Sequence, residues 1–113
     1  MNIKTTTHND VTILRLQDTR LDSTIAADLK AHLLVMLEQG TKNILIDLAK
    51  VEYADSSGLG AILFGIRQAR PFNGQLKLVN VQSRVLSLIK IARLENVIEA
   101  YDDEQEALDS FNE

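Results

Sequence analysis

Apolar residues recur along the chain at two different periods, and each period predicts a kind of element. Alternating or continuous β-branched and aliphatic runs predict four strands, and apolar residues spaced three and four apart predict helices. The predicted strands cover residues 2–7, 11–16, 43–48 and 75–79. The predicted helices run from residues 22–24 to 39, from 57 to 70, onward from 83, and onward from 103. This order of elements is typical of an α/β fold.

Helix and strand ends are marked by residues with restricted or unusual backbone preferences. Gly40 stands where a left-handed residue ends the first helix, and Pro71 stops the second. Ser83 is expected to cap the third helix, and Asp103 begins a capping-box pattern before the last. A short extended piece is expected at 97–98.

The connections between the strands predict how they pair. The first two strands are joined by a short polar turn, which predicts an antiparallel hairpin. Helical crossovers are right-handed, so the second, third and fourth strands are expected to be parallel. The prediction is a four-stranded, mostly parallel sheet packed with about four helices. Loops that follow parallel strands leave the sheet at the same end, which places the loop at Asp22 beside the segment at Asp55 and Ser56.

The second helix divides into two predicted faces. Its core face is expected to contain Leu59, Ile62, Leu63, Ile66 and Ala69. The opposite face is expected to contain Ser57, Ala61, Phe64 and Gln68. An exposed phenylalanine at position 64 is either an isolated apolar residue, which is common, or part of a contact surface together with the small residues Ala61 and Gly65.

The segment Asp55-Ser56-Ser57-Gly58 connects a buried strand to this helix. Aspartate and serine are favoured at helix N-termini because their oxygens accept bonds from free backbone N–H groups, so Asp55 or Ser56 is expected to be the cap. The same N–H groups and the helix dipole tolerate an added anion, such as a phosphoryl group on a serine. From spacing alone, a simple helix cap that follows a core strand is the favoured interpretation.

The run from Asp55 to Gly60, preceded by an apolar strand and Tyr53, resembles the signature of the anti-sigma factor antagonists, which are small single-domain members of the STAS family. The resemblance covers most of the chain and implies one STAS domain over residues 1–113. It also implies that Ser56 is the phosphorylated residue, with Ser57 the less favoured candidate. The Leu21-Asp22 pair matches the family's acid in the first loop.

The resemblance further implies the partners. In this family the unphosphorylated protein binds an anti-sigma factor that is itself a serine kinase, and so frees the sigma factor. Phosphorylation abolishes binding, and a metal-dependent serine phosphatase restores it. The expected partner-binding residues are Asp22, Asp55, Ser56, Ser57, Gly58 and Phe64. The partner supplies the ATP, so no cofactor or metal is expected to bind this chain.

The composition of the chain argues against several classes of function. The net charge of −4 argues against nucleic-acid binding, and the absence of cysteine excludes thiolate chemistry. No apolar run is long enough to span a membrane and no signal peptide precedes the first strand, so a cytoplasmic protein is expected, as a monomer or weak dimer.

Two other functions remain to be weighed. A serine hydrolase would need a glycine two residues before its nucleophile, where this chain has Ala54, so no enzyme activity is expected. A STAS module that acts as a fixed scaffold, in a lipid transporter or a signalling assembly, is the alternative to a switch.

Overall fold

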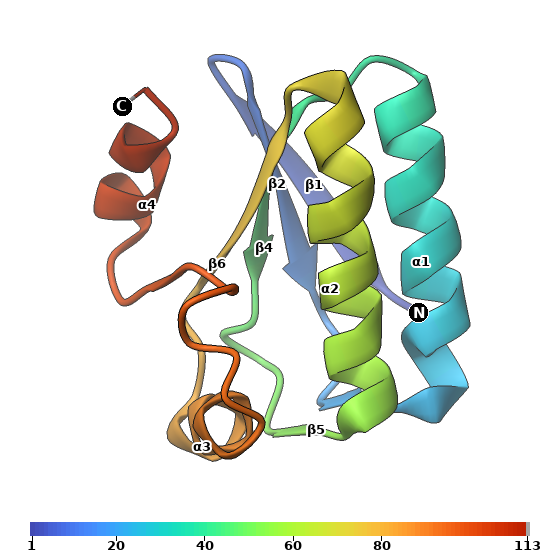
Figure 1. The fold of residues 1–113 in the computed structure, drawn as a ribbon, viewed down its shortest axis with the longest axis vertical. Coiled ribbons are helices and arrows are strands. Elements are labelled where there is room, and N and C mark those ends of the chain that lie inside the picture. The colour runs from blue at the N-terminus through green and yellow to red at the C-terminus, as the bar shows by residue number, and fades with distance from the viewer. Residues whose placement is uncertain (113) are drawn as a thin grey trace.

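The computed structural model describes residues 1–112, which are built around a five-stranded sheet with the order β1-β2-β4-β6-β7 (Figure 1). The strands are β1 (Ile3–His8), β2 (Val11–Leu16), β4 (Asn43–Asp47), β6 (Gln75–Val79) and β7 (Ala100–Tyr101). β1 is antiparallel to β2, and every other neighbouring pair is parallel. The predicted α/β fold class, with an antiparallel first strand, is confirmed.

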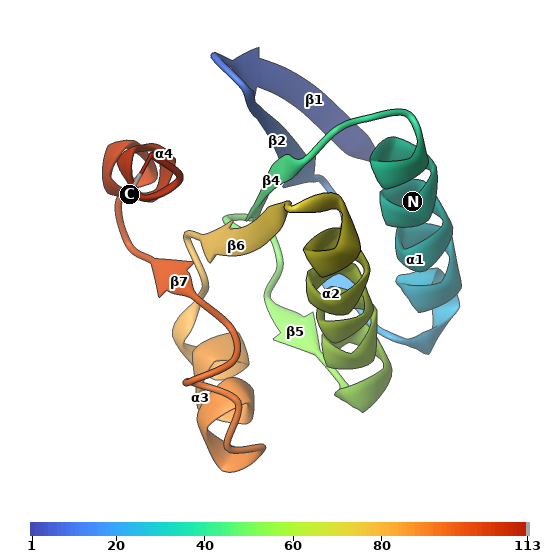
Figure 2. The same ribbon diagram turned by 45° about the horizontal axis from the view of Figure 1, so that its top comes forward.

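The four predicted helices are present. They are α1 (Ser23–Glu38), α2 (Ser56–Ala69), α3 (Ser83–Ile91) and α4 (Glu104–Ser110), and a short 3-10 helix, η1 (Arg70–Phe72), follows α2. Helices α1 and α2 lie side by side on one face of the sheet, and α4 covers the other face (Figure 2). The first helix ends as predicted, because Gly40 has a φ of +99°, a conformation that a residue with a Cβ rarely adopts.

Side chains that alternate along the central strands contribute to two hydrophobic clusters, one on each face of the sheet. In β2, Leu14 and Leu16 face the large cluster beneath α1 and α2, whereas Val11 and Ile13 face the smaller cluster beneath α4. A strand covered on both faces is expected to be apolar at nearly every position, which explains the imperfect polar alternation of this sequence.

Two expectations for the C-terminal third are wrong. Residues 97–98 form a turn, and the extended piece is β7, which pairs with the end of β6 and adds a fifth strand. A strand of two residues has no periodicity that a sequence can display. Ser83 is not a cap either: Gln82 occupies the cap position without a side-chain cap bond, and its Nε2 donates to the Ala49 carbonyl over 2.8 Å.

A second, two-stranded sheet joins the two loops that precede α1 and α2. Its strands are β3 (Arg20–Leu21) and β5 (Tyr53–Ala54), paired in parallel. The Asp55 N–H also donates to the Leu21 carbonyl over 3.3 Å. The sequence predicted that the Asp22 loop lies beside the Asp55–Ser56 segment, and this pairing confirms it.

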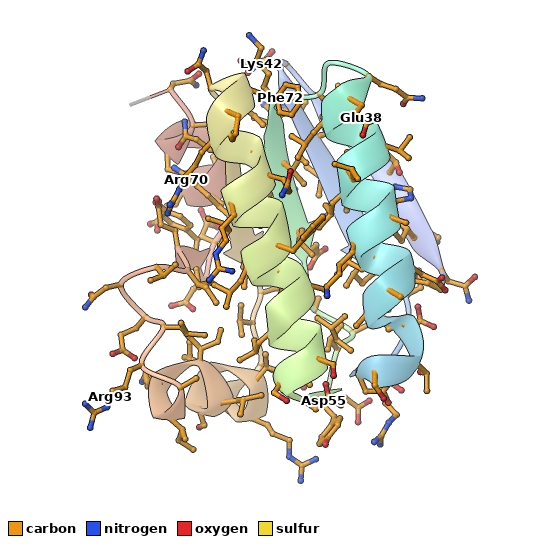
Figure 3. All side chains as sticks on the ribbon, turned by 45° about the vertical axis from the view of Figure 1, so that its right-hand side comes forward. Glu38, Lys42, Asp55, Arg70, Phe72 and Arg93 are labelled. Atoms are coloured by element: carbon orange, nitrogen blue, oxygen red, sulfur yellow. The ribbon has the colours of Figure 1, made fainter. Side chains whose placement is uncertain are left out.

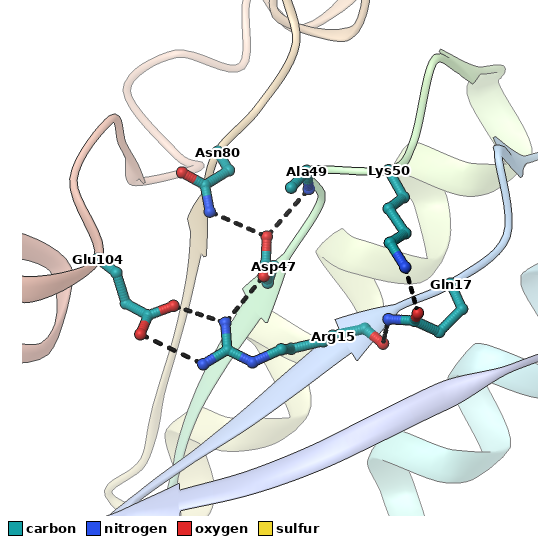
Figure 4. A network of polar contacts seen from close by, with 7 residues as sticks. All are labelled: Arg15, Gln17, Asp47, Ala49, Lys50, Asn80 and Glu104. Atoms are coloured by element: carbon teal, nitrogen blue, oxygen red, sulfur yellow. Dashed lines mark hydrogen bonds and ion pairs between the residues drawn. The ribbon is translucent and has the colours of Figure 1, made fainter.

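A polar network at the end of the sheet fixes α4 to β2 (Figure 4). The Arg15 guanidinium donates to both Glu104 oxygens, over 2.6 and 3.2 Å, and to Asp47 Oδ2 over 2.9 Å. Asp47 Oδ1 accepts from Asn80 Nδ2 and from the Ala49 N–H. Burial raises the pKa of the Asp47 carboxyl, but the hydrogen bonds from Asn80, Ala49 and Arg15 outweigh burial and hold it below its ordinary value.

We expect Asp47→Asn to destabilise the protein in a pH-dependent way. A carboxyl whose pKa is lower in the folded state stabilises the fold above its unfolded pKa of about 3.9, and this contribution is lost as the pH falls through the folded pKa. Chemical denaturation at pH 7 should therefore show a loss of about 1–3 kcal/mol, because the three partly buried hydrogen bonds to Asp47 lose a charged acceptor. The loss should shrink below about pH 4.

The matched control is Asp28→Asn, which changes an exposed acid of α1. This variant should stay within about 0.5 kcal/mol of wild type at every pH. A difference between the Asp47 variant and wild type that is the same at pH 3 and pH 7 would contradict the role assigned to the carboxylate.

Candidate functional site

The candidate site is built on the first turn of α2. Asp55 is the N-cap, and its Oδ1 accepts a hydrogen bond of 3.0 Å from the Gly58 N–H. Ser56 is the first residue of the helix, and both Ser56 and Ser57 are exposed. Of the two predicted caps, Asp55 therefore performs the capping, and the Ser56 hydroxyl is accessible from solvent.

Asp22 caps α1 next to this turn. Its Oδ1 accepts from the Thr24 N–H over 3.0 Å and from the Thr24 hydroxyl over 2.5 Å, and its Oδ2 accepts from Arg20 Nε over 3.1 Å. The Thr24 hydroxyl and the Arg20 side chain lower the pKa of the Asp22 carboxyl. The Arg20 guanidinium also lies 4.4 Å from the centre of the Tyr53 ring. The two loops thus meet through side chains as well as through β3 and β5.

Gly58 lets the two loops approach this closely. A Cβ at this position would lie 2.1 Å from the Leu21 carbonyl oxygen and 2.8 Å from Leu21 Cγ. Both distances are far shorter than a normal contact, so the role of Gly58 is to allow α2 to start directly against β3. The predicted site residues at positions 22, 55, 56, 57 and 58 are therefore brought together by the fold.

Ser56 lies between two hollows. The first, of 530 Å³, lies between the start of α2 and α3 and is lined by Tyr53, Ala54, Asp55, Ser56, Arg84, Ser87, Leu88 and Ile91. The second, of 420 Å³, lies between α1 and α2 and is lined by Ser23, Ala26, Ala27, Lys30, Ser56, Ser57 and Gly60. Ser56 lines both hollows, whereas Ser57 lines only the second.

The predicted outer face of α2 is partly wrong. Ala61 and Gly65 are buried, and a Cβ at Gly65 would lie 2.8 Å from the Leu33 side chain on α1. The helical wheel placed these small residues toward solvent because it considered only the sheet beneath α2, whereas α1 packs along its flank. Phe64 is half-buried, with the Lys30 ammonium 6.0 Å from the centre of its ring.

Three cations of the site were not singled out from the sequence: Arg20, Lys30 and Arg84. Each reaches the site from a different element, namely β3, α1 and α3. No motif links them, because their proximity depends on the packing of α1 and α3 around the start of α2. Arg20 lies two residues before Asp22 and Arg84 lies in the first turn of α3, whereas Lys30, in the middle of α1, has no comparable sequence signal.

Residues 1–112 contain no group of three or more histidine, cysteine or acidic residues that could hold a metal ion. None of the helices in this range combines the length and the apolar character needed to cross a membrane.

Comparison with known proteins identifies the family. A STAS domain model matches residues 2–107. The chain belongs to the STAS domain family. The resemblance derived from the segment between Asp55 and Gly60 is thereby confirmed.

Individual STAS relatives agree in sequence and in fold. The chain is similar to an anti-sigma-B factor antagonist of Staphylococcus epidermidis, with 29% identity over 98 residues, which cover 87% of this chain and 90% of the relative. An anti-sigma-factor antagonist (STAS) domain protein from Planctomyces limnophilus has the same fold, with a TM-score of 0.86 at 24% identity over 98% of each chain. The phosphorylated form of SpoIIAA, a Bacillus cell fate determinant, superposes with a TM-score of 0.72 at 21% identity, over 96% of this chain and 98% of SpoIIAA.

Proposed function

We propose that this protein is an anti-sigma factor antagonist that works by partner switching. Its unphosphorylated form binds an anti-sigma factor with serine kinase activity and so releases the sigma factor. Phosphorylation of Ser56 prevents this binding, and a metal-dependent serine phosphatase reverses the modification. The observation that carries the proposal is the position of Ser56, an exposed hydroxyl that follows the Asp55 cap and lies between two hollows.

Phosphorylation here would change the surface without disturbing the fold. A phosphoryl group adds a charge of about −1.5 to −2 and three acceptor oxygens. The free N–H groups and dipole at the start of α2 tolerate that charge within the protein. A partner that covers Ser56 would have to bury the charge, so binding is lost while the fold remains.

The names of the relatives support the same function. The S. epidermidis protein is named an anti-sigma-B factor antagonist, and SpoIIAA has been solved in a phosphorylated form. Both are bacterial regulators, which fits a cytoplasmic protein acting as one STAS domain. The net charge of −4 favours protein partners over nucleic acid.

The test is phosphorylation by the cognate kinase. The purified protein is mixed with ATP and the serine kinase of the anti-sigma type encoded in the same genome, and the products are measured by intact mass. Wild type and Ser57→Ala should gain one phosphoryl group, and Ser56→Ala should gain none. Equal phosphorylation of Ser56→Ala would contradict the assignment, and no phosphorylation of any variant would favour the scaffold alternative.

Phe64→Ala is expected to weaken binding of the kinase about tenfold with little loss of stability. Phe64 lies on α2 beside Lys30, which also lines the hollow next to Ser56. Aromatic side chains are enriched at the cores of interfaces, where truncating a well-packed residue costs more than about 1 kcal/mol of binding. We expect the melting temperature to fall by less than about 5 °C.

The control is Phe72→Ala, which truncates a more exposed ring in η1, after the end of α2 that lies far from Asp55 (Figure 3). This variant should bind the kinase like wild type. A fall in melting temperature well beyond that of Phe72→Ala would show that Phe64 belongs to the core and not to the binding surface.

A further inference from the structure

The hollow between α2 and α3 contains Ser56 at one side and Arg84 at the other. Arg84 is an exposed residue in the first turn of α3. Among residues 1–112, the only other ionised group that lines this hollow is Asp55, whose carboxylate accepts the Gly58 N–H. Arg84 and Ser56 therefore line the same space of 530 Å³.

Two other cations lie near Ser56, and each differs from Arg84 in its contacts. Arg20 donates to Asp22 and stacks on Tyr53. Lys30, in the hollow on the α1 side, lies over the Phe64 ring. Neither Lys30 nor Arg84 forms an ion pair within residues 1–112, but only Arg84 lines the hollow between α2 and α3. Arg84 is thus the cation of this hollow that is available for a new anion.

We propose that Arg84 binds the phosphoryl group of phosphorylated Ser56, and that this ion pair closes the hollow between α2 and α3. The inference rests on the proposed function, because it concerns the phosphorylated form. A guanidinium presents a planar set of donors that matches two phosphoryl oxygens at once, which a lysine ammonium does not. The phosphoryl group is held on the protein by its ester bond, so only the side chains of phosphorylated Ser56 and Arg84 have to be ordered.

This pair would make the switch more than a repulsive charge. Leu88 and Ile91 form the apolar wall of the same hollow, and the side chain of Ile91 is 78% exposed. A phosphoryl group paired with Arg84 across the entrance would exclude a partner's apolar side chain from that wall. Phosphorylation then removes a contact surface and adds an unfavourable charge in one step.

The experiment measures the second pKa of the phosphoryl group, which is about 6 in phosphoserine. Phosphoserine is incorporated at position 56 by a reassigned codon, and the protein is titrated by 31P NMR. A neighbouring guanidinium favours the dianion, so Arg84→Gln should raise this pKa by at least about 0.5. Arg93→Gln is the control, because Arg93 follows α3 and points away from Asp55 (Figure 3).

An equal pKa in the Arg84 and Arg93 variants would overturn the inference. Loss of fold is not expected, because removing a cation from the first turn of α3 is favourable toward the helix dipole, and the melting temperature of the unmodified variant checks this. The titration needs no kinase, so it separates the two proposals. A raised pKa in Arg84→Gln supports the contact even if no kinase modifies Ser56, and phosphorylation of Ser56 with no change in pKa overturns the contact alone.

Discussion

Replacing Ser56 with aspartate is expected to lower the affinity for the anti-sigma factor kinase by at least about 100-fold, or about 2.7 kcal/mol. The aspartate places a negative charge at the start of α2 that the partner would have to bury. Desolvating such a charge without a matched cation on the partner costs several kcal/mol. The affinity is measured by calorimetry with the purified kinase and a nucleotide.

Two control variants separate charge from shape. Ser56→Ala removes the hydroxyl without adding charge and should bind within a few-fold of wild type. Ser57→Asp adds the same charge one residue further along, where the side chain lines only the hollow on the α1 side, so its effect should be smaller. If Ser56→Asp binds the kinase as tightly as wild type, the proposed switching mechanism is wrong.

Gly58→Ala is expected to destabilise the fold by about 3 kcal/mol, the upper end of the usual cost of overpacking. The added methyl would lie 2.1 Å from the Leu21 carbonyl oxygen. That carbonyl belongs to β3, which is paired with β5, and the Leu21 side chain is fully buried. Neither the strand nor the helix can shift cheaply, so the melting temperature should fall by roughly 10 °C or more.

Gly60→Ala provides the matched control two residues along the same helix. A Cβ at Gly60 meets no atom within 4 Å, and an alanine costs less backbone entropy in a helix than a glycine. We expect a gain of about 0.5–1 kcal/mol from this change. Equal effects of the two substitutions would contradict the claim that close packing against Leu21 is the reason for the first glycine.

The helices and strands that are long enough to show a regular spacing of apolar residues were predicted from the sequence. α1 and α2, the four main strands and the pairing of the Asp22 loop with the Asp55 segment all followed from apolar spacing and from the rules for parallel sheets. Asp103 was also predicted correctly as the cap of α4, where it accepts the Glu106 N–H. These features depend on a few neighbouring residues or on chain order alone.

Features that depend on how one helix or strand packs against another were not predicted from the sequence. β3, β5 and β7 have two residues each, too few to show a period. Ala61 and Gly65 are buried, and α1 packs against α2, which a helical wheel drawn for one helix cannot show. Arg84 joins the site only because α3 packs near the start of α2. The residues of the switch motif were found from the sequence, and the cations around them required the fold.

The proposed switch is tested most directly by phosphopeptide mapping of the protein isolated from its own cells, resting and stressed. Trypsin cleaves after Lys50 and Arg67 and releases one peptide whose only hydroxyl side chains are Tyr53, Ser56 and Ser57. We predict phosphate on Ser56 whose occupancy changes with growth conditions. Absence of phosphate from this peptide under every condition would contradict the switch and favour a fixed scaffold in which Asp55 and Ser56 only begin a helix.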